Sequence, residues 1–288
     1  MPRGTVPLKS TEPASAATLS AGARLMMALR VFRGAFFFGR KGLIIWDSWE
    51  MWVMQIVITP IAQIGFFALL SIYLRYPSSV TQYIVIGNAI QSMSFSAVFA
   101  VANITSQDKW QGTLPSTMVT PANRAALFIG RAGFQVLLSA LIAAAGLLYA
   151  ATIFGVSFAA ADFAGIAVTV LLTSITMIGF GLLISAVGLY MRTAMIVANI
   201  FLFVTLLLSG VNFPVSELPG WLQPLSWAIP LTYGTQAVRD AIAGTSLAGL
   251  LPTLGWETLD GVVVMLAGFA LFTGFENLSR RTGRFEEY

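Results

Sequence analysis

The sequence contains no cysteine and no histidine, and Asp, Glu, Lys and Arg together make up only 10% of its 288 residues. The two missing residue types exclude disulfides, thiolate or imidazole metal sites and histidine-based catalysis in this chain. Soluble domains carry about 25% charged residues, so a chain that is 57% hydrophobic is predicted to cross a membrane several times. Its apolar runs are continuous, whereas strands of a membrane barrel alternate apolar and polar residues, so the predicted class is all-α.

Charge is also missing inside most of the apolar runs. None occurs from Tyr76 to Gln107 or from Ala132 to Ala161. A proton-coupled carrier usually keeps an ionisable group deep in a span, and a membrane enzyme needs paired carboxylates, a metal cluster or an activated nucleophile. The second to fifth expected spans contain no charged residue deep inside, and the first has only Glu50 at its edge, which argues against both classes. Asp260 and Glu276 flank the last run and are expected to reach for the membrane surfaces.

A nucleotide site is missing as well. Residues 34–41 have the glycine spacing of a phosphate loop, but the Lys followed by Ser or Thr that such a loop requires is not there. We therefore expect no cofactor in this chain, and any ATP chemistry must come from another one.

The chain divides into three parts by composition. Residues 1–22 are expected to be a disordered cytosolic tail, 23–46 an amphipathic interfacial helix, and 47–288 a transmembrane domain. An ordinary helix packed on its own protein is the alternative for 23–46. The apolar runs expected to span the membrane are 49–74, 82–104, 127–154, 163–191, 194–211 and 256–278.

The run 218–238 is also uncharged, but it contains Pro219, Pro224 and Pro230, which are costly in a spanning helix. If it does not cross, six spans place both termini and 14 of the 16 Lys and Arg residues inside. Only Arg75 and Arg239 then lie outside, as the positive-inside rule favours. We therefore expect a re-entrant or surface-lying pair of helices on the extracellular side.

Polar residues form a stripe on one face of the second run, because Asn88, Ser92 and Ser96 recur every four residues. Hydrogen bonds between helices use the same residue types, so the stripe fits either helix packing or a substrate path. The candidate substrate-path residues, chosen as apolar, aromatic and neutral polar side chains, are Phe66, Asn88, Gln91, Ser92, Phe95, Phe99, Asn199 and Phe203.

Two loop motifs carry a resemblance. Gly112-Thr-Leu, followed by Thr120-Pro and by Gly130-Arg at the start of a span, resembles the cytosolic motif of type-2 ATP-binding-cassette (ABC) exporter permeases. Asp108-Lys stands where that family has an acidic-basic cluster, while Pro115-Ser departs from its usual continuation. Residues 212–233, followed by Arg239, resemble the family's extracellular re-entrant segment.

The resemblance implies a permease that dimerises, more readily with a second copy of itself, and binds cytosolic ABC ATPase subunits that hold ATP and Mg²⁺. It implies a coupling segment at 105–125 and a re-entrant segment at 212–240, in the cytoplasmic membrane of a bacterium with both termini cytosolic. The implied ATPase-coupling residues are Arg33, Lys41, Asp108, Lys109, Trp110, Gly112, Thr113, Leu114 and Pro121. The implied extracellular-gate residues are Pro214, Leu218, Pro219, Trp221 and Pro230.

The expected activity is export of an amphipathic or lipophilic substrate, such as a drug-like molecule or a lipid or glycolipid conjugate. Export of polysaccharide or teichoic-acid precursors, which the same family performs, is the alternative. A secondary carrier and a membrane-embedded enzyme remain as rivals from other classes.

Overall fold

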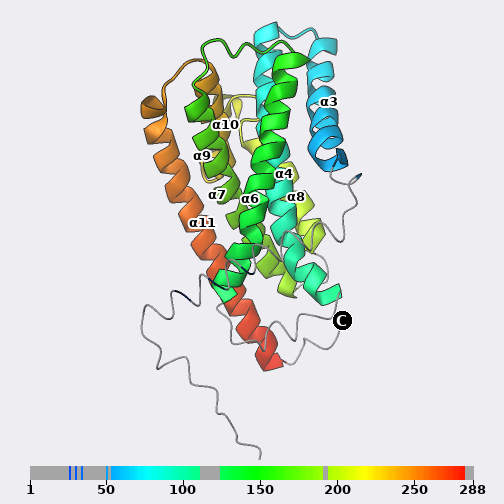
Figure 1. The fold of residues 1–288 in the computed structure, drawn as a ribbon, viewed down its shortest axis with the longest axis vertical. Coiled ribbons are helices and arrows are strands. Elements are labelled where there is room, and N and C mark those ends of the chain that lie inside the picture. Colours follow the sequence, from blue (N-terminus) through cyan, green and yellow to red (C-terminus); the bar gives the residue numbers. More distant parts are fainter. Residues whose placement is uncertain are drawn as a thin grey trace, which may run out of the picture.

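The computed structural model describes residues 53–110, 124–190 and 194–282, together with Met26, Arg30, Gly34 and Glu50. These residues form helices joined by turns and loops, and they contain no strand (Figure 1). The elements are a π-helical turn η2 (Met54–Ile58), α3 (Thr59–Tyr73), α4 (Ser78–Trp110), α6 (Arg124–Thr152), α7 (Phe163–Tyr190), α8 (Ala194–Leu208), a 3-10 turn η3 (Val215–Glu217), α9 (Gln223–Trp227), α10 (Pro230–Ile242) and α11 (Leu247–Thr282).

Five of these helices are long and apolar enough to cross a membrane: Met54–Tyr73, Ser78–Ala102, Gly133–Thr152, Phe163–Val187 and Leu247–Gly274. A shorter apolar helix covers Met195–Leu208. The prediction of an all-α protein with several membrane spans is therefore confirmed. The sixth crossing and the re-entrant geometry stay predictions.

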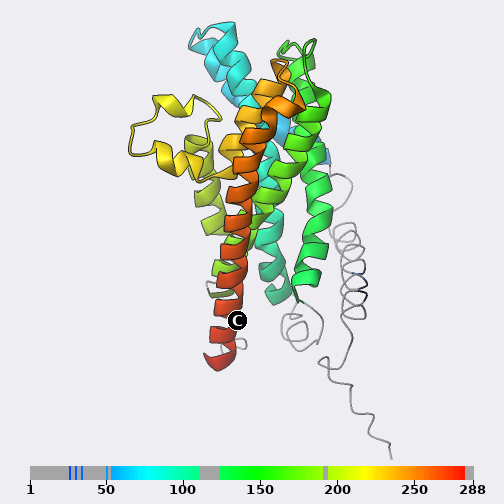
Figure 2. The same cartoon turned by 90° about the vertical axis from the view of Figure 1, so that its left-hand side faces the viewer.

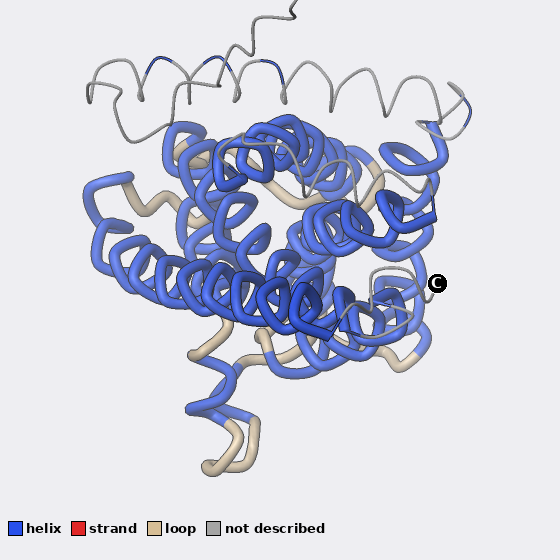
Figure 3. Tube along the Cα trace, turned by 90° about the horizontal axis from the view of Figure 1, so that it is seen from below, coloured by secondary structure: helices blue, strands red, loops and turns tan. Residues whose placement is uncertain are grey.

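Helix α4 is the centre of the bundle. The apolar part of α4 is 83% buried, against 22% for Met54–Tyr73. It packs against α3, α6, α7, α8 and α10, while α11 packs against α7 and α10. Figure 3 views this bundle along its length. A displacement of α4 would therefore reach almost every other helix.

The described helices place two groups of chain ends at opposite ends of the bundle. The end of α4, the start of α6 and the end of α11 lie at the lower end in Figure 1, and the turns 74–77 and 153–162 lie at the upper end. We call the segment 212–240 the proline-rich segment. Its part before Pro230 extends sideways from the upper half of the bundle (yellow in Figure 2), whereas α10 packs against α4, α7 and α11.

Prolines of the proline-rich segment stand where short helices begin. Pro224 lies in the first turn of α9 and Pro230 in the first turn of α10, where the missing backbone N–H has no intrahelical partner to lose. Gly244, with a φ of +102°, follows the end of α10 and supplies the left-handed residue that often ends a helix. The segment is thus two short helices rather than one long one.

The last helix starts earlier than expected. The sequence placed its beginning near residue 256, but α11 begins at Leu247. The carboxylate of Asp162, in the turn before α7, accepts hydrogen bonds from the backbone N–H groups of Ala164, Gly165 and Leu247. One acidic side chain therefore caps the starts of both α7 and α11, and it brings Glu257 and Asp260 inside an apolar helix.

Candidate functional site

Four consecutive backbone carbonyls at the end of α8, from Leu208 to Val211, each accept a hydrogen bond from a side chain elsewhere. The donors are Ser226 Oγ to Leu208 O, Thr235 Oγ1 to Ser209 O at 3.1 Å, Tyr83 Oη to Gly210 O at 2.9 Å, Arg239 Nη1 to Gly210 O at 3.0 Å, and Arg239 Nη2 to Val211 O at 2.9 Å. Carbonyls at a helix end have no intrahelical partner. The proline-rich segment and α4 supply the missing donors, which ties α4, α8 and α10 together.

Arg239 donates two of these five hydrogen bonds. Its guanidinium also donates to Tyr83 O at 3.1 Å, and its Cζ lies 3.4 Å from the centre of the Tyr83 ring, a cation–π contact. Burial, partly offset by Tyr83 and Asp240, lowers the pKa of Arg239 to about 10. The side chain thus stays positive at neutral pH and serves as a rigid, multidentate donor.

Gly87 lets the two parts approach. A Cβ at this position would collide with the carbonyl oxygen of Val211 and with the guanidinium of Arg239. One residue further along α4, Asn88 donates from Nδ2 to Asn212 Oδ1 at 2.8 Å. The contact between α4 and the start of the proline-rich segment therefore depends on one residue without a side chain and one amide pair.

The polar stripe of α4 lies inside this single chain. Asn88, Gln91, Ser92 and Ser96 are buried. Gln91 Nε2 lies 3.3 Å from Thr205 Oγ1 on α8, and Gln135 Nε2 on α6 donates to Ser96 Oγ at 2.6 Å. These are hydrogen bonds between helices, one of the two readings that the sequence allowed.

The other candidate path residues lie apart from that stripe. Phe66 on α3 and Phe203 on α8 are 64% and 65% exposed, and Asn199 on α8 is exposed as well. Phe95 and Phe99 are half-buried on α4 and stack on each other with ring centres 6.1 Å apart. The structure thus divides the set into buried amides and hydroxyls, stacked rings and an exposed apolar face. Their role in a substrate path stays a prediction.

The candidate gate residues are spread over the proline-rich segment. Leu218 and Pro230 are buried, whereas Pro214 and Pro219 are exposed and Trp221 is 73% exposed. Trp227 packs against Tyr233 with ring centres 5.1 Å apart. The exposed tips and the buried anchors alternate along the segment, and its gating role stays a prediction.

Most candidate coupling residues lie outside the described part of the chain: Arg33, Lys41, Gly112, Thr113, Leu114 and Pro121. Asp108, Lys109 and Trp110 lie at the end of the described part of α4. They sit at the end of the bundle where α6 begins and α11 ends. The helix therefore extends past the expected end of the second span, near residue 104, into the coupling segment.

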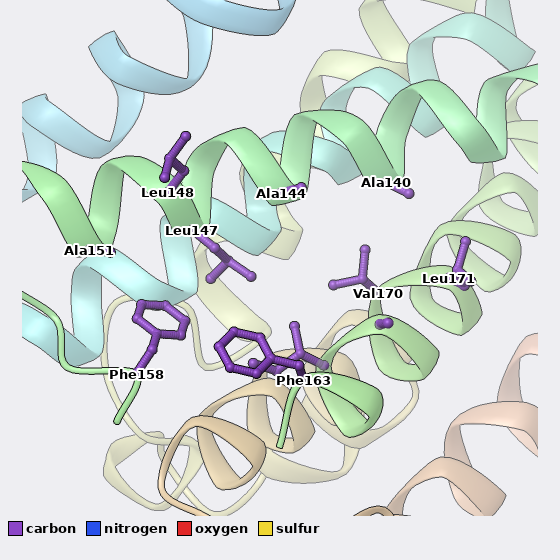
Figure 4. Close-up of a pocket in the computed structure, with 11 residues that line it drawn as sticks. Ala140, Ala144, Leu147, Leu148, Ala151, Phe158, Phe163, Val170 and Leu171 are labelled. Carbon is purple, nitrogen blue, oxygen red and sulfur yellow. The ribbon is translucent and has the colours of Figure 1, made fainter. Parts of the chain in front are cut away.

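An apolar groove opens between α6 and α7. Its volume is about 570 Å³, and its lining contains no polar side chain (Figure 4). Ala140, Ala144 and Leu147 line it from α6, while Phe163 and Val170 line it from α7. Both walls belong to candidate membrane spans, and the apolar lining suits an apolar chain.

The sequence singled out neither Tyr83 nor Gly87, and it gave Arg239 no role in a site. The available signal was that Arg239 is one of two cations assigned to the extracellular side. Among the residues that the structure describes, no three His, Cys, Asp or Glu side chains are grouped so that they could hold a metal ion.

The family of ABC-2 type transporters matches residues 36–243. The chain belongs to the ABC-2 type transporter family. The matched range includes the coupling segment, the stripe on α4 and the junction around Arg239, and it ends before α11. The resemblance inferred from the two loop motifs is thereby confirmed, and the chain is a membrane-spanning ABC transporter permease.

Two curated relatives are also similar, both described as a probable multidrug ABC transporter permease, YbhR, one from Escherichia coli K12 and one from Escherichia coli O157:H7. Each is 26% identical over 200 residues, which cover 69% of this chain and 54% of the relative. The chain thus spans about half the length of these relatives.

Proposed function

We propose that this chain is the permease subunit of an ATP-driven exporter that moves amphipathic or lipophilic molecules out of the cytoplasm or the inner leaflet. The energy comes from separate cytosolic ATPase subunits. The family match over 36–243 carries this proposal, because it includes both the segment implied in ATPase coupling and the proline-rich segment implied in gating. Six spans with both termini cytosolic, in the cytoplasmic membrane of a bacterium, complete the proposal.

Helix α4 is suited to transmit the force. It is one uninterrupted helix of 33 residues, from Ser78 to Trp110, and so measures about 50 Å. Its lower end carries Asp108, Lys109 and Trp110. Its upper part holds Asn88 and the contacts to Val211 and Asn212. A push on the coupling segment would therefore move the anchor of the proline-rich segment.

A second copy of the chain is proposed to face α3 and α8. Both helices flank α4, and each presents exposed aromatic side chains, Phe66 and Phe203 among them. A pathway between two such faces would be apolar and aromatic, which fits lipophilic cargo. The word multidrug in the description of the similar permeases favours the same substrate class over polysaccharide precursors.

The test combines partner capture with transport. Gentle purification from native membranes should yield a nucleotide-binding ATPase with the permease, and inside-out vesicles should accumulate a lipophilic fluorescent dye when ATP is added. Trp110→Ala combined with Gly112→Pro should abolish ATP-dependent uptake while membrane insertion stays normal. The matched control is Trp256→Ala, since Trp256 is 62% exposed on α11. Full uptake by the double variant, or uptake that follows a proton gradient and ignores ATP, would refute the proposal.

A further inference from the structure

Glu257 is a fully buried carboxyl group inside a candidate membrane span. It lies on α11 within Leu247–Gly274, and its exposed fraction is 0%. Ten residues separate it from Leu247, which places it about 15 Å along the helix. An ionisable residue at such a depth is by default a functional one, and neither the family match nor the proposed export mechanism uses it.

Three helices meet at this carboxyl group. Thr173 on α7 has its Oγ1 2.6 Å from Glu257 Oε1. A Cβ at Gly234 on α10 would collide with that same Thr173 hydroxyl. One turn along α11, a Cβ at Gly261 would collide with Thr176. The carboxyl group therefore sits where α7, α10 and α11 approach one another closely.

The described helices that pack around Glu257 offer it no positive charge. Helix α7 contains no Asp, Glu, Lys or Arg. Helix α10 carries three titratable residues, Tyr233, Arg239 and Asp240. The guanidinium of Arg239 donates hydrogen bonds to the backbone carbonyls of Tyr83, Gly210 and Val211. The carboxylate of Asp240 accepts a hydrogen bond from Gln236. Tyr233 packs on Trp227, and α11 itself adds Asp260, a second acid. An ionised carboxylate buried without a partner costs several kcal/mol.

The count of hydrogens favours the neutral acid as well. The Thr173 hydroxyl has a single hydrogen, and its oxygen lies 2.9 Å from Thr169 O as well as 2.6 Å from Glu257 Oε1. If that hydrogen goes to the Thr169 carbonyl, only a protonated Glu257 can supply the hydrogen for the second bond. The polar neighbours that the described residues offer this carboxyl group are the hydroxyls of Thr173 and Thr176, and neither hydroxyl neutralises an anion.

We propose that Glu257 is an intramembrane proton-binding site that controls the seating of α10. With the proton bound, the carboxylic acid donates to Thr173 and the three helices stay packed. Release of the proton leaves an uncompensated anion beneath α10, which carries Thr235 and Arg239, and loosens the proline-rich segment. The proposal needs no ATPase and holds whatever the cargo is.

Infrared spectroscopy of the full chain in lipid nanodiscs tests proton occupancy directly. The wild type should show the C=O stretching band of a protonated carboxylic acid at neutral pH. Glu257→Gln should lose this band, while the matched control Asp260→Asn should keep it. Thr173→Val should shift the band to higher wavenumber, because the C=O is then part of an acid without its acceptor. A wild type without the band, or a Glu257→Gln variant that keeps it, would overturn the proposal.

The coupling to α10 has its own readout. Because the chain has no cysteine, Leu225→Cys places a single spin label on the exposed side of α9. Raising the pH should increase the mobility of this label with Glu257 present and leave it unchanged with Glu257→Gln. If the label has the same mobility at all pH values with Glu257 present, the proton does not control the segment. The same conclusion follows if the chains with Glu257 and with Glu257→Gln respond equally to pH. If Glu257→Gln fails to fold, the band shift in Thr173→Val still decides proton occupancy.

Discussion

Arg239 is the residue whose removal should loosen the proline-rich segment most. In Arg239→Gln, the three carbonyls that accept hydrogen bonds from the guanidinium are not affected equally. Gly210 O keeps its bond from the Tyr83 hydroxyl, and Tyr83 O lies within α4, where helical bonding satisfies it. Val211 O is the one that loses its side-chain donor, and Val211 is fully buried.

The magnitude follows from these losses. A buried carbonyl left unpaired costs about 1–3 kcal/mol, and the cation–π contact with Tyr83 adds about 0.5–2 kcal/mol. We therefore expect Arg239→Gln to cost about 3 kcal/mol in the docking of residues 209–212. A cost of 1.4 kcal/mol is about tenfold in an equilibrium constant, so local opening should become about 100-fold more frequent.

Hydrogen exchange of the backbone amides near residues 208–214, followed by mass spectrometry in nanodiscs, measures this opening. Arg75→Gln is the matched control, because Arg75 is the other cation at the same end of the bundle and is exposed. Arg239→Lys should fall between wild type and Gln, since an ammonium group lacks the planar fork. Equal exchange in wild type and Arg239→Gln would show that the guanidinium does not hold the turn.

Two further predictions concern α4. Gly87→Ala should destabilise the protein by about 1–3 kcal/mol, because the added Cβ collides with Val211 and Arg239. Thermal unfolding in detergent measures this loss of stability. The control Gly65→Ala should have little effect, because the space around Gly65 is open. Trp110→Cys should resist an impermeant maleimide in intact cells and react after permeabilisation, and labelling of intact cells would reverse the proposed orientation.

Elements defined by long apolar runs were predictable from the sequence. The start of α7 at Phe163 coincides with the expected boundary, because the change in composition at that point is sharp. The start of α11 was not predictable, since it depends on Asp162, which lies 85 residues away from Leu247 along the chain. A cap supplied from another loop leaves no local pattern.

The residues of the candidate site were also predictable only in part. Asn88 and Gln91 were found because polar residues in an apolar run are conspicuous. Tyr83 and Gly87 were missed, because a tyrosine near a span end is typical of an interfacial belt and a glycine in a membrane helix is common. Their importance comes from Arg239, more than 150 positions later, and only the fold brings the three residues together.

The end of α8 gives a reason for the proline-rich segment to exist. Helix α8 ends at Leu208, and the carbonyls of residues 208–211 have no partner within the helix. A helix that ends within the bilayer exposes carbonyls that lipid cannot satisfy. Ser226, Thr235 and Arg239 donate to those carbonyls, so the proposed re-entrant segment completes the span chemically. Any movement of the segment must then break these bonds together, and that requirement makes it a two-state element suited to gating.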